Sequence, residues 1–507
     1  MTSFSDYDYA LFFAVIIVVL FVGFISFIWR KPKTMEDITE WGLGGRRFGT
    51  VVVWFLLGGD MYTAYTLIAV PGVAGGSGAL AMFAITYGIL IYPIVYLMMP
   101  RLWTVSKKRN YITVGDFVRD RFSSPFLALL IALTGVLAEL PYLALQIVSI
   151  GYVMQAIFLP VTISLIIAFL LVAAFTFLSG MRAPALTAII KDAIVWGVVL
   201  TIVIYVPIHY GGFANIFSTA SAYTKTTKTF TPLDMPPTLA LGYVTLALGS
   251  ALALFLYPHG ITGTLGSKDV RTIKRNASLL PLYNVLLLIV AILGVAAVVA
   301  NGGVFGTKGQ PATSFAFPYL IKDLFPSTFT ALAYAAIVVG SVVPASIMAL
   351  ASANLLTRNV YVQYINKNAT SAQQALLSRF LVIVVIVAAL IFSLTPAANG
   401  YVIYLQTFGG AFILQTLPAV YLALYTRKFS KYSIGIGWFI GLSSTLYLLY
   451  LLNFSGSLYK PFDFIYVGIF SLILNVVTVL IVHLISLVMH KVKDEGIIDN
   501  SELASEF

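Results

Sequence analysis

Long apolar stretches separated by short polar connections run along the whole chain. Most approach or exceed the roughly 20 residues that a helix needs to cross a bilayer. The pattern predicts about thirteen transmembrane helices, at residues 9–29, 51–74, 78–99, 126–157, 160–179, 184–208, 237–267, 278–301, 327–356, 378–396, 400–426, 433–453 and 462–490. We therefore expect an all-α polytopic membrane protein, with one transmembrane domain over residues 1–490 and a tail at 491–507.

The composition supports a membrane protein. Of the 507 residues, 60% are hydrophobic and only 10% are charged, and the mean hydropathy is +0.96. Soluble domains are about 45–50% apolar and about 25% charged. The chain has no cysteine, which excludes disulfides, thiol chemistry and cysteine-bound zinc. The first apolar stretch is long enough to span a membrane and lacks a basic leader, so we expect no cleavable signal peptide.

The basic residues predict the orientation. With the N-terminus outside, the inner connections hold 24 of the 30 lysines and arginines, the outer ones hold five, and Lys191 lies within a span. Basic residues concentrate on the cytoplasmic side of membrane proteins. The sequence thus predicts an N-out, C-in, multi-pass protein of the cell membrane, and the net charge of +11 indicates topology rather than a nucleic-acid partner.

Three segments outside the spans carry further expectations. The outer connection at 209–236 is rich in Ser, Thr and Tyr and is typical of a solvated loop. The one at 302–326 contains SFAFPYLIKDLF, which predicts a short amphipathic helix lying on the membrane surface. The C-terminal tail is acidic and is expected to be loose.

Two spans carry helix-breaking residues beside polar groups. Gly58, Gly59 and Asp60 lie near the middle of the second span, and Pro258 and His259 interrupt the seventh. Irregular backbone at membrane depth is tolerated only where it is buried in protein or lines a cavity. Interrupted helices in matching halves of a chain point to the binding site of a transporter. The two breaks lie five spans apart, as an inverted repeat of five plus five helices requires.

Each of these features has a plainer alternative. The Gly58–Gly59 pair would also allow close helix packing, and His259 could lie at the inner edge of the membrane beside water. Glu139, in GVLAELPYLALQ, could make a structural hydrogen bond. Charges within a membrane are expensive, by about 2.5–3.5 kcal/mol on insertion scales, and are functional candidates by default. Lys191 could also extend along its apolar stem to the inner interface.

Several motifs resemble the sodium/solute symporter family. They are WGLGGRRFG (41–49), LGGDMYTAYTLIAVPG (57–72), YITVGDFVRDRF (111–122), FTFLSGMRAPALTAIIKD (175–192) and NLLTRNVY (354–361). The resemblance implies a LeuT-like fold of thirteen helices, with core repeats at about 51–208 and 237–426. VLAELPYLALQIV, FLYPHGITGTLGSKDVRTIKRNASLLPLY and VVPASIMALASANLLTRNVY are closest to the monocarboxylate transporter branch. That branch implies substrates such as lactate, pyruvate, acetate or propionate.

The family's sodium site is only partly matched. The resemblance places its backbone carbonyls at Gly58 and Met61 and its supporting aspartate at Ala188. Its hydroxyl pair falls at Val343 and Pro344, whose side chains cannot bind a hard cation. If the match to the family were in error by one helical turn, the hydroxyls of Ser341 and Ser346 could join the two carbonyls in a sodium site.

Lys191 lies one turn beyond Ala188 and replaces the family's glutamine. We hypothesise that its ammonium occupies the vacated cation position, held by the carbonyls of Gly58 and Met61 and by Asp60. Asp192 points about 100° away and need not pair with it. Buried lysines can release a proton when their surroundings change. This hypothesis favours proton coupling or sodium independence, with sodium coupling as the alternative and no resident cofactor or metal.

The expected activity is symport of a small carboxylate by alternating access, by a functional monomer in the lipid bilayer. Candidate substrate-binding residues carry polar groups close to the two breaks: Gly59, Tyr62, Thr63, Tyr142, Gln146, Tyr257, His259 and Gln406, with Gln415 further along. The alternative is sodium-coupled symport of another family substrate, such as proline, alanine, pantothenate or a sugar. A channel would need rings of acidic residues, and an enzyme would need clustered catalytic groups. Neither is visible in the sequence.

Overall fold

The structure is a computed structural model that describes residues 4–26, 36–60, 62–157, 160–227, 235–302, 313–395, 398, 402–489 and 496–503. Within these ranges, eleven helices are long and apolar enough to cross a membrane. Two shorter apolar helices, Thr50–Gly59 and Thr162–Phe177, accompany them. The all-α polytopic fold is confirmed, whereas the count of thirteen spans and the N-out orientation stay predictions.

The elements follow the predicted spans closely. The α-helices are α1 Asp6–Ile25, α2 Ile38–Leu43, α3 Thr50–Gly59, α4 Val70–Ser77, α5 Phe83–Lys108, α6 Val114–Phe122, α7 Pro125–Ala156, α8 Val161–Ser179, α9 Arg182–His209, α10 Phe213–Thr227, α11 Ala240–Leu254, α12 Pro258–Leu265, α13 Val270–Leu279, α14 Tyr283–Ala300, α15 Ala316–Leu324, α16 Ser327–Leu355, α17 Ser371–Ser393, α18 Ile403–Ile413, α19 Leu417–Val420, α20 Lys431–Leu451, α21 Val467–Val488 and α22 Asn500–Leu503. The strands β1 Leu458–Tyr459 and β2 Ile465–Tyr466 pair antiparallel between α20 and α21.

Two π-helices, η2 Tyr65–Ala69 and η7 Leu356–Ile365, extend α4 and α16. Short 3-10 turns make up the remaining helical elements: η1 Gly44–Arg46, η3 Gly78–Met82, η4 Pro237–Leu239, η5 Leu280–Leu282, η6 Thr313–Phe315, η9 Leu414–Thr416, η10 Leu422–Leu424 and η11 Lys460–Phe462. π-Helical turns frequently mark functional positions in membrane and soluble helices. η2 follows directly on the first predicted interruption.

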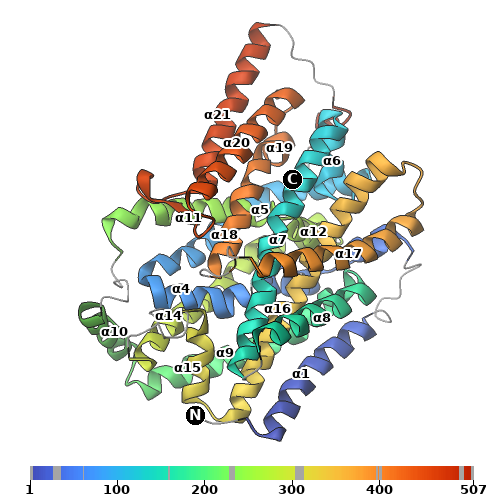
Figure 1. Cartoon of the computed structure of the whole chain (residues 1–507). Helices are drawn as coiled ribbons and strands as arrows, with labels where there is room; N and C mark the ends of the chain where they lie inside the picture. Colours follow the sequence, from blue (N-terminus) through green and yellow to red (C-terminus); the bar gives the residue numbers. More distant parts are fainter. Residues whose placement is uncertain are drawn as a thin grey trace.

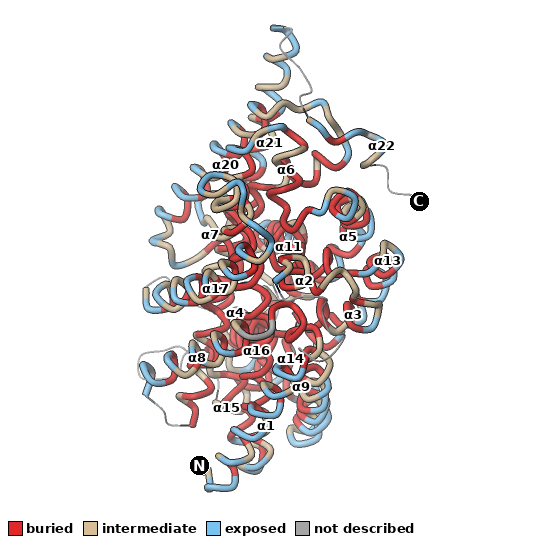
Figure 2. The backbone as a smooth tube through the Cα atoms, turned by 90° about the vertical axis from the view of Figure 1, so that its right-hand side faces the viewer, coloured by how far each residue is buried: buried red, intermediate tan, exposed pale blue. Residues whose placement is uncertain are grey.

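Helix α16 lies at the centre of the molecule (Figures 1 and 2). Its most apolar stretch is wholly buried, and it packs against α7, α9, α1 and α17. Its sequence, STFTALAYAAIVVGSVVPASIMALASANL, is rich in Ala and Ser, which let helices approach closely in membranes. By contrast, α1 and α21 at the ends of the chain are largely exposed and apolar, as expected for lipid-facing helices.

Both predicted interruptions are present. Helix α3 ends at Gly59, and helical structure resumes with η2 at Tyr65. Helix α11 ends at Leu254 and α12 begins at Pro258, the first helical position, where proline's missing N–H costs nothing. The residues described in both breaks, at 60, 62–64 and 255–257, are buried. Side chains can therefore meet main-chain carbonyls in the interior of the protein.

Two connections differ from the sequence prediction. The predicted loop at 209–236 contains α10, which packs against α14 and whose Ile216 and Ala220, one turn apart, are buried. The helix predicted in the second connection is α15, but most of it is buried against α4, α14 and α16. The apolar face of α15 thus packs against other helices of the protein instead of against lipid.

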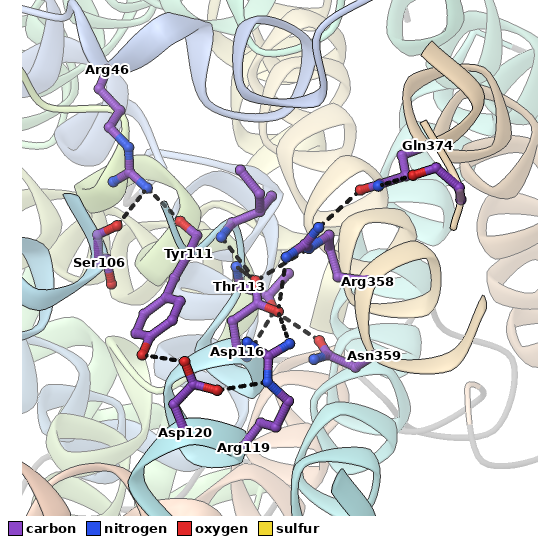
Figure 3. Close-up of polar contacts among 12 residues, drawn as sticks. Arg46, Ser106, Tyr111, Thr113, Asp116, Arg119, Asp120, Arg358, Asn359 and Gln374 are labelled. Carbon is purple, nitrogen blue, oxygen red and sulfur yellow. Dashed lines mark hydrogen bonds and ion pairs between the residues drawn. The ribbon is translucent and has the colours of Figure 1, made fainter. Parts of the chain in front are cut away.

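A buried polar network joins α6 to η7 and α17 (Figure 3). Asp116, fully buried on α6, accepts hydrogen bonds from the backbone N–H of Ile112 at 2.9 Å and from Arg358 at 3.3 and 3.4 Å. Arg358 also donates to Gln374 at 3.0 Å, and Thr113 donates to Asn359 at 2.7 Å. The network holds together helix ends that belong to the predicted cytoplasmic side.

Backbone hydrogen bonds also join the two interrupted helices on this predicted cytoplasmic side. The segment before α3 pairs with the segment after α12, where the N–H of Phe48 donates to Gly266 O at 3.1 Å and that of Lys268 donates to Phe48 O at 2.9 Å. Arg46 adds hydrogen bonds to the carbonyls of Tyr111 and Ser106. The two bent helices are thus tied to each other and to the start of α6 at this end.

The C-terminal segment 496–503 is docked, which corrects the expectation of a loose tail. Ile498 is fully buried, and its neighbour Ile497 donates its N–H to Asp120 O at 3.0 Å. Arg109 donates two hydrogen bonds to the Glu502 carboxylate, both at 2.8 Å. The tail is acidic and the connection between α5 and α6 is basic, so electrostatic attraction accounts for the docking.

Acidification is expected to release this docked tail. The hydrogen bonds from Arg109 lower the pKa of Glu502 to about 2, from an ordinary value of about 4.3. Because the ionised carboxylate makes the contact, docking is at full strength above about pH 4 and is lost as the pH falls toward 2. A spin label at Ser501→Cys, unique in a chain without cysteine, measures tail mobility. Adding Glu502→Gln should mobilise the label at neutral pH, and an unchanged spectrum would contradict the assignment.

Candidate functional site

The Lys191 side chain reaches the break between α3 and η2. Its ammonium Nζ donates to Gly59 O at 2.6 Å and to Tyr62 O at 2.9 Å. It also lies 2.8 Å from the Asp192 carboxylate, and both side chains are fully buried. The lysine therefore does not extend to the interface. A methyl group on Gly59 would lie 3.1 Å from Nζ and 3.0 Å from Asp192, so both side chains would have to shift by a few tenths of an ångström to admit it.

Aromatic residues enclose the lysine–aspartate pair. Tyr283, at the start of α14, donates its hydroxyl to Asp192 at 2.8 Å. Tyr62 stacks on the Tyr283 ring with centroids 4.7 Å apart and donates its hydroxyl to the Tyr283 carbonyl. Trp196, one turn after Asp192, packs edge-on against both rings. The pair is thereby held in a low-dielectric setting, where its electrostatic attraction is strong.

His259 connects the two breaks. It occupies the first turn of α12, and its Nε2 lies 3.1 Å from the Asp60 carboxylate in the break after α3. Its Nδ1 lies 2.7 Å from Glu139 Oε1 on α7, which also accepts the backbone N–H of His259 at 2.9 Å. The imidazole and Glu139 are fully buried, so His259 does not lie at the inner edge of the membrane.

The expected details at the break need three corrections. The ammonium is held by the carbonyls of Gly59 and Tyr62 rather than that of Gly58, which instead accepts the backbone N–H of Tyr62 at 3.2 Å. Asp60 faces His259, not Lys191. Asp192 does pair with Lys191, because the long lysine side chain is free to turn toward its neighbour. Met61 lies outside the described residues.

The positions matched to the family's sodium ligands lie around the same break. Ala188 is buried on α9 one turn before Lys191. On α16, Val343 and Pro344 are buried one turn beyond Gly340, where an added Cβ would lie 3.8 Å from the Tyr62 carbonyl oxygen. The hydroxyls of Ser341 and Ser346 donate to carbonyls of their own helix, at 2.8 and 2.6 Å. Among the described residues, no group of three His, Asp or Glu side chains could hold a metal ion.

The candidate substrate-binding residues divide between the two breaks: Gly59, Tyr62, Thr63 and Gln146 make their contacts at the first break, and Tyr142, Tyr257 and Gln406 lie around His259 at the second. Tyr142 and Tyr257 pack against the imidazole, and Tyr257 donates to Gln406 O at 2.8 Å. Gln146 Oε1 accepts the N–H of Ala64 at 3.3 Å. The Thr63 hydroxyl caps the start of η2 by accepting the N–H of Tyr65 at 2.9 Å. Gln415 lies apart and bonds α21 through Gly468 and Asn475.

Unpartnered polar atoms mark this region as a place where a ligand could bind. Within the described structure, Gln146 Nε2 and both amide atoms of Gln406 are buried with no hydrogen-bond partner. Buried polar groups are nearly always satisfied, so each exception needs an explanation. Amide donors of this kind can bind a carboxylate.

Two residues of the site were missed by sequence reasoning. Tyr283 and Trp196 are aromatic residues among many, since aromatic side chains are 14% of the chain. Trp196 lies four residues after Asp192 and one turn further along the same helix face, a spacing that could have indicated contact. Nothing in the sequence links Tyr283 to Asp192, because they come from spans separated by α10, α11 and α12.

Two interrupted helices that meet at buried charges within a membrane-embedded helical protein are the arrangement typical of secondary transporters. The chain belongs to the sodium:solute symporter family, whose family model matches residues 41–441. It is 40% identical over 481 residues to a monocarboxylate transport permease protein of Rhizobium johnstonii, covering 93% of this chain and 95% of that protein. It is 35% identical to the uncharacterised symporter YodF of Bacillus subtilis, covering 88% of each. It is thus a transporter and not an enzyme.

Solved structures share the fold. A Na⁺-coupled sialic acid symporter, in a substrate-bound outward-open state, superimposes with a TM-score of 0.74 at 16% identity, covering 95% of this chain and 98% of that one. The nucleobase-cation-symport-1 transporter Mhp1 superimposes with a TM-score of 0.51 at 12% identity, covering 90% and 96%. These likenesses agree with the LeuT-like architecture implied by the sequence.

Proposed function

We propose that this protein imports a small monocarboxylate across the cell membrane and couples its movement to protons rather than to sodium. The substrate class is supported by the 40% identity to a monocarboxylate transport permease over nearly the full length of both chains. The unpartnered amide donors of Gln146 and Gln406 suit a carboxylate. Transport would proceed by alternating access around the two breaks.

The coupling ion is inferred from the position of the Lys191 ammonium. Two main-chain carbonyls and a carboxylate converge on it at 2.6 to 2.9 Å. Oxygen ligands of this kind are those that a hard cation such as sodium prefers. The fixed ammonium supplies the positive charge that the converging oxygens require. A bound sodium ion at the same oxygens would meet like-charge repulsion.

Uptake driven by one ion gradient at a time distinguishes proton coupling from sodium coupling. Purified protein in liposomes should accumulate labelled lactate or pyruvate under an inward proton gradient without sodium, and not under a sodium gradient at equal pH. Empty liposomes correct for entry of undissociated acid. Accumulation that requires sodium would contradict proton coupling and favour the sodium-coupled alternative, of which the sodium/proline symporter of Escherichia coli, 24% identical over 423 residues, is an example. Proline and alanine serve as competing substrates to test the class.

A further inference from the structure

A groove lies between the first turns of α7 and α20, at the end of the molecule predicted to face the cytoplasm. Its volume is about 620 Å³, within the range of roughly 300–1,000 Å³ that is typical of small-molecule sites. Its walls are mainly apolar and include Phe126, Leu127, Leu130, Ile436, Trp438 and Phe439. Ser124, Lys431 and Tyr432 line it where the two helices begin. The groove is thus apolar along its length and polar at its entrance.

Two contacts between the helices set the shape of the groove. Trp438 is buried and donates its indole N–H to the Thr134 hydroxyl at 3.0 Å. At Gly435 an added Cβ would lie 4.0 Å from Leu127 Cδ1, which is ordinary van der Waals contact. Elsewhere α20 packs chiefly on α21. The groove is therefore a gap between α20 and α7, and the Trp438–Thr134 bond fixes its far wall.

The groove is open to the surrounding bilayer. Phe126, Tyr432 and Phe439 are each more than half exposed, as expected for side chains that another apolar molecule covers. Between Lys431 and Phe439, α20 rises about 12 Å, at 1.5 Å per residue. The hydrocarbon of one leaflet is about 15 Å deep, whereas a membrane-spanning partner helix needs a face of about 30 Å. The groove therefore fits an acyl chain of one leaflet better than it fits a partner helix.

The entrance of the groove is positively charged. Lys431 lines it, with its Nζ 5.4 Å from the centre of the Tyr432 ring. The connection between α19 and α20 adds Arg427 and Lys428 and contains no acidic residue. Arg427 is directed to the docked tail, where it donates to Gly496 O at 2.9 Å, whereas Lys428 is exposed. A lysine can lay its stem along an apolar wall and hold its ammonium among lipid headgroups.

We propose that this groove binds one anionic phospholipid of the cytoplasmic leaflet. Its acyl chain lies against Leu127, Gly435 and Trp438, and its phosphate lies beside Lys431 and Lys428. Basic residues next to a membrane attract anionic headgroups. A zwitterionic headgroup has no net charge and gains less from the same two lysines. The site is independent of the substrate and coupling ion proposed above, and the bound lipid fills the gap between α20 and α7.

Fluorescence quenching by brominated lipids tests the site in a bilayer. Wild type and Trp438→Phe are reconstituted in phosphatidylcholine containing a small fraction of brominated phosphatidylglycerol or brominated phosphatidylcholine. The difference between the two proteins reports quenching of Trp438. We expect brominated phosphatidylglycerol to bind at Trp438 at least about fivefold better than brominated phosphatidylcholine, the factor that one lysine near a membrane surface supplies. Trp438→Phe should show no such preference in its remaining emission.

Charge and shape variants locate the preference. Lys428→Gln combined with Lys431→Gln should bring the two lipids to parity, while Lys268→Gln, which removes an exposed lysine on the same predicted side, should keep the preference. Gly435→Leu fills the groove and should reduce quenching by both lipids, and it replaces Trp438→Phe in the comparison if that variant fails to fold. Equal quenching of wild type by both lipids would overturn the proposal, as would a preference that the double lysine variant retains. Absence of quenching by either lipid would also overturn it, because a protein partner would then occupy the groove.

Discussion

Replacing Lys191 by alanine is expected to abolish proton-driven uptake. The substitution removes the ammonium from two carbonyls and leaves the fully buried Asp192 without its cation. Removing one partner of a buried ion pair costs about 3–5 kcal/mol. We therefore expect both lower stability and loss of transport, measured by thermal unfolding in detergent and by lactate uptake in proteoliposomes. Lys268→Ala, which removes an exposed lysine, is the control and should transport normally.

A double variant distinguishes a structural from a functional role of Lys191. Lys191→Ala combined with Asp192→Asn removes both charges, so no uncompensated carboxylate stays buried. Leaving no uncompensated charge avoids the largest cost of breaking a buried ion pair. The double variant should recover part of the stability lost in Lys191→Ala and still fail to couple uptake to protons. Proton-driven uptake by either variant would contradict the role assigned to the ammonium.

The second large effect concerns the network around Asp116. Asp116→Ala removes a fully buried carboxylate that accepts from Arg358 and from the backbone N–H of Ile112. It leaves the half-buried Arg358 guanidinium without its main partner and should destabilise the protein by about 3–5 kcal/mol. Unfolding of purified protein, followed by tryptophan fluorescence, measures the loss.

Asp269 provides a matched comparison for Asp116. It also caps a helix, accepting the N–H of Thr272 at 2.7 Å, but it is exposed. Loss of an N-cap of this kind costs about 1 kcal/mol. If Asp269→Ala and Asp116→Ala lowered stability equally, the network in Figure 3 would contribute no more than a helix cap.

Much of the fold follows from simple patterns in the sequence. Apolar stretches of sufficient length locate the spans, and Gly58–Gly59 and Pro258 locate the two breaks. The direction of Lys191 toward the first break was predicted from the resemblance to the family's sodium site, whose cation position the ammonium was expected to take. The inner position of His259 was left open, because a histidine beside a break suits either water or a carboxylate.

The finer geometry depends on information that helical periodicity lacks. Carbonyls in an interrupted helix have no fixed spacing, so the ligands of Lys191 differ by one residue from those expected. Side chains of adjacent residues start about 100° apart on a helix, yet Lys191 bends back to Asp192 because its four-carbon stem is flexible. The partnership of Asp60, His259 and Glu139 joins three distant segments, and no local pattern encodes it.

Binding of radiolabelled sodium to the purified protein tests most directly whether the Lys191 ammonium stands in for a metal ion. In the presence of saturating lactate, the wild-type protein should show no saturable sodium binding, while the same preparation binds labelled lactate. Saturable sodium binding to wild type that Lys191→Ala leaves unchanged would show that the metal site is intact elsewhere and would contradict the account.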